Sequence, residues 1–268
     1  MLKDITLGQY FPGNSIAHKL DPRTKILLVT LYIIALFSAK GWMGYAVMAV
    51  TLAACVKVSH VGLRALVRGL KPLVFIIAFT GILNMFFTPD THYLWEWGIL
   101  RVSVKGIENA LFMVIRIMLL VMGTFLMTYT TSPIRLTDGL ESLLNPLKKI
   151  HVPVHELAMM MAIALRFIPT LIEETDKIMS AQKARGADFD SGNIFQKAKA
   201  LVPILVPLFI SAFRRADELA TAMECRCYHG GEGRTKLHVL KYQRRDYVAL
   251  TGGVVILALV VVLRRLGV

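Results

Sequence analysis

Four long apolar stretches divide the sequence. They cover residues 26–56, 72–87, 111–129 and 247–263, and the first is interrupted at Lys40–Gly41. A helix rises about 1.5 Å per residue and needs about 20 residues to cross a hydrocarbon core of about 30 Å. The last two stretches roughly meet that length, and the second meets it with its flanks. The first stretch is too long for one crossing and short for two.

Basic residues decide how the first stretch is divided. The loop 57–71 contains four basic residues and no acid, so it is expected on the cytoplasmic side. The N-terminal segment, residues 1–25, is also basic and is expected on the same side. Two short crossings that turn at Lys40–Gly41 satisfy both expectations. We therefore predict four transmembrane helices in residues 26–131 and a fifth in residues 246–268.

The loop 88–106 differs from loop 57–71 because its acids and bases balance. It also contains Tyr93, Trp95 and Trp97, aromatic residues typical of a membrane–water interface. We expect an external interfacial loop, and not a cation site built from its His92 and Glu96.

Residues 132–245 are helical in pattern but too charged to span, with 17 Lys+Arg and 12 Asp+Glu. Proline and capping signals predict three helices: a short one from Pro133 to about Pro146, and two long ones over residues 153–185 and 191–226. Gly186 is the expected C-terminal stop of the first long helix. This segment is predicted to be a cytoplasmic-side coupling domain.

Both long helices are amphipathic, because apolar and small residues recur at steps of three and four. Most of this length is expected to be helix-on-helix packing. The apolar face of one helix is also expected to contact lipid headgroups or another membrane subunit. Helices of about 45 Å are longer than a helix pair needs for packing on each other alone. The three methionines of residues 159–161 favour an adaptable surface and ordinary gap-filling equally. Pro169, Pro203 and Pro207 predict kinks or short breaks.

The ends of these helices form a weak internal repeat. Residues 176–186 align with residues 217–227 at an offset of 41, with the shared pattern Asp-x-aliphatic-x-x-Ala-x-x-small-Arg-small. One cation near a helix C-terminus is explained by the helix dipole, at about 0.3–1 kcal/mol. Two matched tips centred on Arg185 and Arg226 indicate a binding role in addition to the interaction with the helix dipole. Small neighbours let a helix end enter a groove, where a guanidinium can hold a carboxylate, so two similar sockets are expected.

Composition agrees with a membrane protein. The chain is 55% hydrophobic with a mean hydropathy of +0.57, and its formal net charge is +13. Nucleic-acid binding is disfavoured, because basic residues in 132–245 are interleaved with acids and stacking aromatics are scarce there. The three cysteines, Cys55, Cys225 and Cys227, are expected to be reduced thiols.

The two tips resemble those of the transmembrane T component of energy-coupling factor (ECF) vitamin transporters, of the type that shares one module among several substrate-binding subunits. Ala184-Arg185-Gly186 matches the Ala-Arg-Gly motif of that family, and Cys225-Arg226-Cys227 keeps the arginine between two small residues. Residues 8–13 and 18–25 resemble the family's entry segment, and residues 228–235 resemble the stretch after the second motif.

The resemblance implies a coupling subunit of an ABC-type importer in the bacterial cell membrane. Two ABC ATPase subunits, which the unequal motifs suggest are non-identical, would bind the two tips and hold ATP and magnesium. This chain would bind no cofactor and catalyse no reaction, consistent with its lack of a phosphate-binding G-x-x-x-x-G-K-[ST] loop. Exchangeable S components would supply the vitamin or other micronutrient. The expected S-component surface consists of Leu157, Met160, Met161, Ala164, Leu205 and Leu208.

Other readings are weaker. A secondary transporter that carries solute itself needs polar or broken helices at the membrane midplane. Thr80, Asn84 and Gly252–Gly253 are too few to form such a site. A metal site at Cys225, Cys227 and His229 has poor geometry for tetrahedral zinc. Arg116, inside the fourth crossing, is expected to pair within the protein, with Glu108 or Glu141 as candidates.

Overall fold

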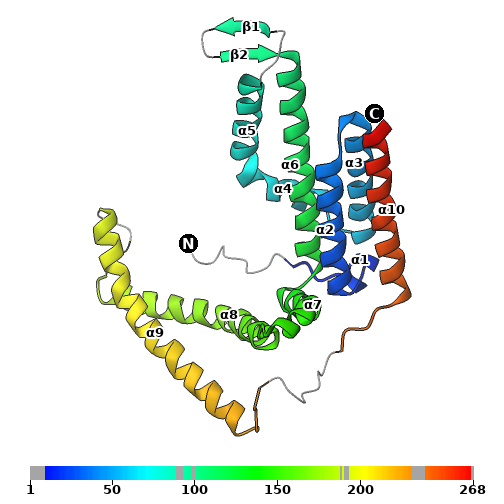
Figure 1. Ribbon diagram of the computed structural model, residues 1–268. Coiled ribbons are helices and arrows are strands. Elements are labelled where there is room, and N and C mark those ends of the chain that lie inside the picture. The colour runs from blue at the N-terminus through cyan, green and yellow to red at the C-terminus, as the bar shows by residue number, and fades with distance from the viewer. Residues whose placement is uncertain are drawn as a thin grey trace. The chain divides into compact units, whose positions relative to one another are not determined.

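The computed structural model describes residues 10–88, 93–97, 100–187, 189, 193–230 and 239–266 (Figure 1). The chain forms two compact units. We call the first the bundle unit, made of Gly8–Leu140 and Leu240–Val268. The second is the helix-pair unit, Glu141–Val239.

Helices make up nearly all of the bundle unit. In chain order its elements are α1 (Ile16–Lys19), α2 (Pro22–Ser38), α3 (Gly41–Ser59), α4 (Leu63–Leu70), the 3-10 helix η2 (Lys71–Leu73), α5 (Val74–Phe87), β1 (Tyr93–Trp97), β2 (Leu100–Ser103), α6 (Val104–Thr130), the start of α7 (Pro133–Leu144) and α10 (Arg244–Leu266). Helix α10 packs along α2, and α5 packs along α6.

The division of residues 26–56 into two helices is confirmed. Helix α2 begins with Pro22 behind the N-cap Asp21 and ends at Ser38, and α3 begins at Gly41. Gly41 has a φ of +69°, a left-handed conformation that glycine adopts at no steric cost. The chain therefore reverses where the apolar pattern was interrupted.

Both predicted loops contain structure that the sequence pattern did not predict. Residues 57–71 include α4, which continues through η2 into α5, so that Leu63–Phe87 is a single 25-residue helical stretch. Residues 88–106 include the antiparallel hairpin of β1 and β2, with Trp97 opposite Leu100. His92 and the side chains of the hairpin lie outside the described residues, so the cation-site alternative is not addressed there.

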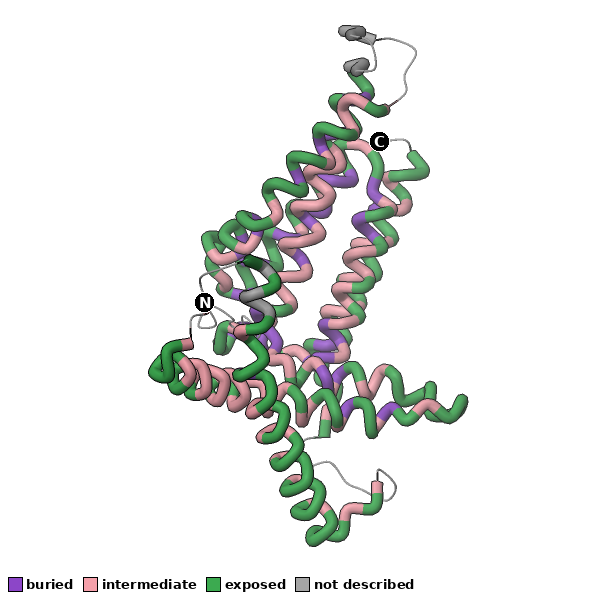
Figure 2. The backbone as a smooth tube through the Cα atoms, turned by 90° about the vertical axis from the view of Figure 1, so that its left-hand side faces the viewer, coloured by how far each residue is buried: buried purple, intermediate pink, exposed green. Residues whose placement is uncertain are grey.

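The core of the bundle unit lies where α2, α3, α6 and α10 meet (Figure 2). Gly123 of α6 lets the ring of Tyr32 lie against the helix backbone, because a Cβ at position 123 would fall 2.5 Å from that ring. The Tyr32 hydroxyl donates to the Leu119 carbonyl at 3.0 Å. Close approach between α2 and α6 is thus fixed by one small residue and one hydrogen bond.

The helix-pair unit contains η3 (Asn145–Ile150), α8 (Val154–Ala184) and α9 (Ile194–Glu224), which confirms the two long helices. The predicted cap at Asp190–Ser191 lies outside the described residues. Neither helix breaks at its prolines. Pro207 cannot donate to the carbonyl of Pro203, and Gln182 of α8 donates to that carbonyl instead, at 3.4 Å. The neighbouring helix therefore supplies the missing bond.

Within the described part of the chain, five helical stretches are long and apolar enough to cross a membrane. They are α3, Leu63–Phe87, α6, α8 and α10. The number agrees with the predicted five, but the members differ. Helix α8 is included because of its apolar first half, whereas α2, with 17 residues, is too short to be included. The protein is an all-helical, multi-pass membrane protein apart from its short hairpin.

Candidate functional site

The first helix tip closes α8 with a Schellman motif. The N–H of Ala187 donates to the Gln182 carbonyl and the N–H of Gly186 donates to the Lys183 carbonyl, both at 3.0 Å. Gly186 has a φ of +88°, which such a motif requires at that position. The predicted stop at Gly186 is confirmed, and Arg185 is the last residue before the chain turns.

The second tip closes α9 with the same two bonds. The N–H of Tyr228 donates to the Met223 carbonyl at 3.1 Å, and the N–H of Cys227 donates to the Glu224 carbonyl at 2.8 Å. Each donor and acceptor lies 41 positions after its counterpart in α8, so the repeat extends to the backbone hydrogen bonds. Cys227 takes the place of Gly186 with a φ of +55°.

Both tips are accessible. All six residues of the two motifs are exposed: Ala184, Arg185, Gly186, Cys225, Arg226 and Cys227. Neither arginine forms an ion pair within the described residues. Their assignment as ATPase-binding residues stays a prediction, but the exposure and the shared geometry are those that insertion into two similar sockets requires.

An ion pair joins α8 and α9 at two positions that share the offset of 41 and lie two residues before the repeat begins. Glu174 accepts a 2.8 Å bond from Arg215, 41 residues later, and also accepts a bond from the Ser211 hydroxyl. The apolar first half of α8 ends at Ile172, so Glu174 lies outside it.

The contacts between α8 and α9 show that the two helices run in opposite directions. Glu174 meets Ser211 and Arg215, whereas Gln182, later in α8, meets Pro203, earlier in α9. Figure 1 shows the two helices crossing. At 1.5 Å per residue, the part of α9 from Pro203 to its tip is about 35 Å long. The two arginine tips therefore lie at opposite ends of the pair.

Apolar side chains cover much of the surface of both helices. Of the predicted S-component surface, Leu157, Met160, Met161, Ala164 and Leu205 are exposed, and Leu208 is half-buried. Further exposed residues on α9 are Leu201, Val202, Val206, Phe209, Ile210 and Phe213. The exposed apolar surface is larger than the six predicted residues, and most of it lies on α9. The assignment of the six residues to an S component stays a prediction.

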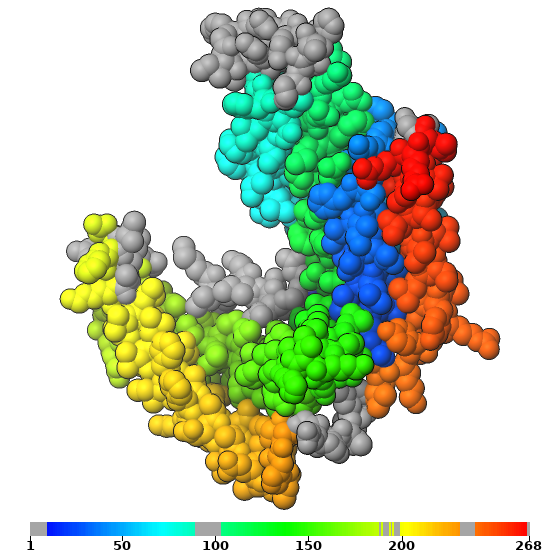
Figure 3. Space-filling view, in the orientation of Figure 1, coloured from blue at the N-terminus to red at the C-terminus, as the bar shows by residue number. Residues whose placement is uncertain are grey.

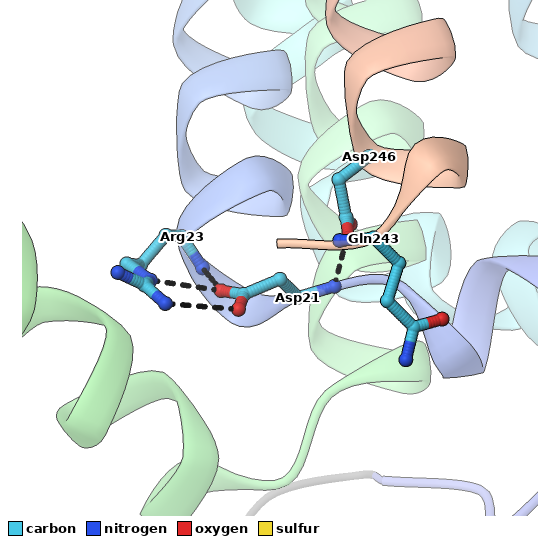
Figure 4. A network of polar contacts seen from close by, with 4 residues as sticks. All are labelled: Asp21, Arg23, Gln243 and Asp246. Atoms are coloured by element: carbon cyan, nitrogen blue, oxygen red, sulfur yellow. Dashed lines mark hydrogen bonds and ion pairs between the residues drawn. The ribbon is translucent and has the colours of Figure 1, made fainter. Parts of the chain in front are cut away.

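Asp21 and Arg23 of the entry segment lie against the start of α10 (Figure 4). The Asp21 carboxylate caps α2 and accepts bonds from the backbone N–H and guanidinium of Arg23. Asp246, which is 2% exposed, accepts from the Asp21 N–H at 2.9 Å and from the Gln243 N–H at 2.8 Å. Sequence reasoning missed Asp246, although an acid three residues after a helix N-cap is half of a capping box.

Arg116 does not pair as predicted. Its guanidinium donates to the Tyr45 hydroxyl of α3, with Nε at 2.9 Å, whereas Glu141 is bonded to His155. Stacking of the Tyr45 and Phe112 rings places that hydroxyl within reach of Arg116. At the alternative metal site, His229 Nδ1 lies 2.8 Å from the Cys227 carbonyl oxygen.

Comparisons with known proteins identify the family of the chain. Residues 13–237 match the family model described as "Cobalt transport protein". The chain is 57% identical to a protein of Acidaminococcus fermentans over 98% of this chain and 97% of that one, and 55% identical to one of Ruminiclostridium cellulolyticum over 94% of each. A Bacillus subtilis protein is 46% identical over 98% of this chain and all of its own length. All three are named energy-coupling factor transporter transmembrane protein, which confirms the resemblance. The chain therefore belongs to the family of energy-coupling factor transporter transmembrane proteins.

Proposed function

We propose that the chain couples two ABC ATPase subunits to a substrate-binding S component, for uptake of vitamins or other micronutrients. One observation carries the proposal: two exposed arginine tips with identical backbone hydrogen bonding lie at opposite ends of one crossed helix pair. Two related ATPases present two related sockets, and a matched pair of tips fits them. The unequal flanks, Ala/Gly at one tip and Cys/Cys at the other, favour non-identical ATPases.

ATP would be bound and hydrolysed with magnesium on the partner subunits, and this chain would hold no nucleotide. Closure of the ATPases would move both sockets and change the crossing angle of α8 and α9. The apolar surface of these helices would then reorient or release the S component. Such coupling requires the helix pair to favour different geometries with and without nucleotide, because otherwise no free energy passes between the sites. The basic loop 57–71 supports a cytoplasmic position for this machinery.

The test replaces Arg185, Arg226 or both with alanine in the assembled transporter. Truncating one partner of a buried charge pair costs about 2–5 kcal/mol, so each tip should lose roughly 30-fold or more in docking affinity. Copurification of the ATPases, ATP hydrolysis and uptake in proteoliposomes are measured together. Arg214→Ala is the matched control, because Arg214 is exposed on α9 away from the tip. Unchanged uptake and copurification in the double variant would disprove the proposal.

A second measurement separates the proposal from a secondary transporter. The purified chain alone, reconstituted in liposomes with an ion gradient, should move no vitamin. Substrate flux by the isolated chain would favour the secondary transporter instead.

A further inference from the structure

A groove of about 660 Å³ opens in the bundle unit, lined mainly by α2, α3 and α10, with further residues from α1 and α6. Apolar side chains make most of its wall, among them Leu28, Leu52, Leu126 and Val248. Figure 3 shows α10, orange to red, lying along the blue α2. A volume of this size is typical of ligand sites, and an apolar wall at membrane depth selects a hydrocarbon ligand.

Positive charge gathers at one end of the groove. The described lining residues include Lys25, Arg244 and Arg245, and no acid. Lys25 already donates to the Thr130 carbonyl and the Thr131 hydroxyl. Arg244 and Arg245, in the first turn of α10, are exposed and form no ion pair within the described part of the chain. Two guanidinium groups are thus available beside the mouth of an apolar groove.

The acids at the starts of α2 and α10 do not neutralise these arginines. Asp246 is 2% exposed, and its two oxygens accept from the backbone N–H groups of Asp21 and Gln243. The Asp21 carboxylate is in turn bonded to Arg23. Both carboxylates are turned into the joint between α2 and α10, which leaves the cationic end of the groove uncompensated.

The length of the groove matches one lipid leaflet. On α10 the lining runs from Arg244 to Ile256, a rise of about 18 Å. Half of a 30 Å hydrocarbon core is about 15 Å. An acyl chain lying along the groove from a headgroup at Arg244 and Arg245 would therefore end near the bilayer midplane.

Two adjacent glycines have different roles along this wall. A Cβ at Gly253 would lie 2.8 Å from the Leu28 side chain, so Gly253 permits α10 to pack on α2. A Cβ at Gly252 would meet nothing within 4 Å, although Gly252 lines the groove. Gly252 thus leaves open the space that a ligand would occupy.

We propose that this groove binds one anionic glycerophospholipid, with an acyl chain between α2, α3 and α10 and its phosphate at Arg244 and Arg245. The inference goes beyond the coupling function and does not depend on it. Charge complementarity selects an anionic lipid over a neutral one, and the apolar wall selects a lipid over a soluble phosphate.

The test titrates the purified full-length chain in detergent with phosphatidylglycerol or phosphatidylcholine and counts bound lipid by native mass spectrometry. The Arg244→Ala/Arg245→Ala variant should bind phosphatidylglycerol about 30-fold more weakly, because each basic residue at an anionic lipid surface contributes about fivefold. Gly252→Leu should weaken binding about fivefold or more by filling the groove, since overpacking costs at least that much.

Matched controls lie on the same helix. Arg264→Ala/Arg265→Ala removes equal charge at the far end of α10, and Val254→Leu adds bulk at an exposed position outside the groove. Both should bind phosphatidylglycerol like the unmodified chain, and all variants should keep its thermal unfolding midpoint. Equal binding of the two lipids by the unmodified chain would overturn the proposal. Undiminished phosphatidylglycerol binding in both groove variants would also overturn it.

Discussion

Gly186 and Cys227 occupy the same position of the repeat and meet the same backbone requirement at different cost. Each is the left-handed residue of a Schellman motif, with φ values of +88° and +55°. A residue with a Cβ pays roughly 1–2 kcal/mol there, whereas glycine does not. The tip of α9 is therefore closed less stably than the tip of α8.

Exchanging these residues should exchange the stability of the tips. Cys227→Gly is expected to stabilise the α9 tip by about 1 kcal/mol, and Gly186→Ala to destabilise the α8 tip by a similar amount. Hydrogen exchange of the Ala187 and Tyr228 amides, which donate the closing bonds, measures both effects. Cys225→Ala is the control, since Cys225 has no positive φ. Equal protection of Tyr228 with cysteine and glycine at position 227 would contradict the prediction.

The hydroxyl of Tyr45 accepts hydrogen bonds from Arg116 inside an apolar helix bundle, and the guanidinium also lies over the rings of Phe37 and Tyr45. Tyr45→Phe removes the hydroxyl that accepts these hydrogen bonds from the Arg116 guanidinium. The bundle should therefore lose about 1–3 kcal/mol of stability. The thermal unfolding midpoint in detergent measures the loss. Tyr247→Phe, at a 60% exposed residue, should have little effect. An equal shift from the two substitutions would show that the Arg116 bond is not responsible.

At the scale of elements, local signals predicted more than long-range ones. Residues 153–185 were predicted as a helix and α8 covers Val154–Ala184, because proline at one end and glycine at the other are local signals. The partner of Arg116 and the joint at Asp246 could not be read from the sequence, since each depends on helices 71 and 225 residues apart meeting in one register. The bond that replaces the one lost at Pro207 comes in the same way from Gln182, a residue of another helix.

Neutralising Glu174 should loosen the crossing of α8 and α9. Glu174→Gln keeps the size of the side chain but weakens the bonds from Arg215 and Ser211, at a cost of about 1 kcal/mol for this partly exposed pair. Spin labels on the equivalent exposed positions 180 and 221 would report a broader distance distribution.

Glu173→Gln is the matched control for that measurement. Glu173 is the exposed neighbour of Glu174 in the same helix, so this substitution removes an equal charge without changing the ion pair at the crossing. A distribution that widens equally in both variants would mean that net charge, and not the ion pair, sets the crossing.

At the scale of the whole molecule, burial divides the chain unevenly (Figure 2). Among described hydrophobic residues, the helix-pair unit buries Val154, Ala158 and Ile204, whereas the bundle unit buries the rest of the core. Such a unit has little apolar burial to stabilise it alone, so its helices should open more readily than the bundle.

Hydrogen exchange should therefore be fast in α8 and α9 of the isolated chain. Addition of the two ATPase partners should slow it about tenfold or more, because binding stabilises the bound conformation. The amides of α2 and α3 are the internal control and should change little. Equal protection of α8 and α9 with and without the partners would contradict the proposed docking.

The Glu174–Arg215 ion pair lies at the same distance along the helix from each arginine tip. Arg185 lies eleven positions after Glu174, and Arg226 lies eleven positions after Arg215, so both arms are about 16 Å long. A rotation of each helix by about 10° about this ion pair displaces its tip by about 3 Å. In the proposed complex, equal arms would give both ATPases the same displacement at their tips. A difference between the two would then arise from how tightly each ATPase binds its tip and not from the length of the arm.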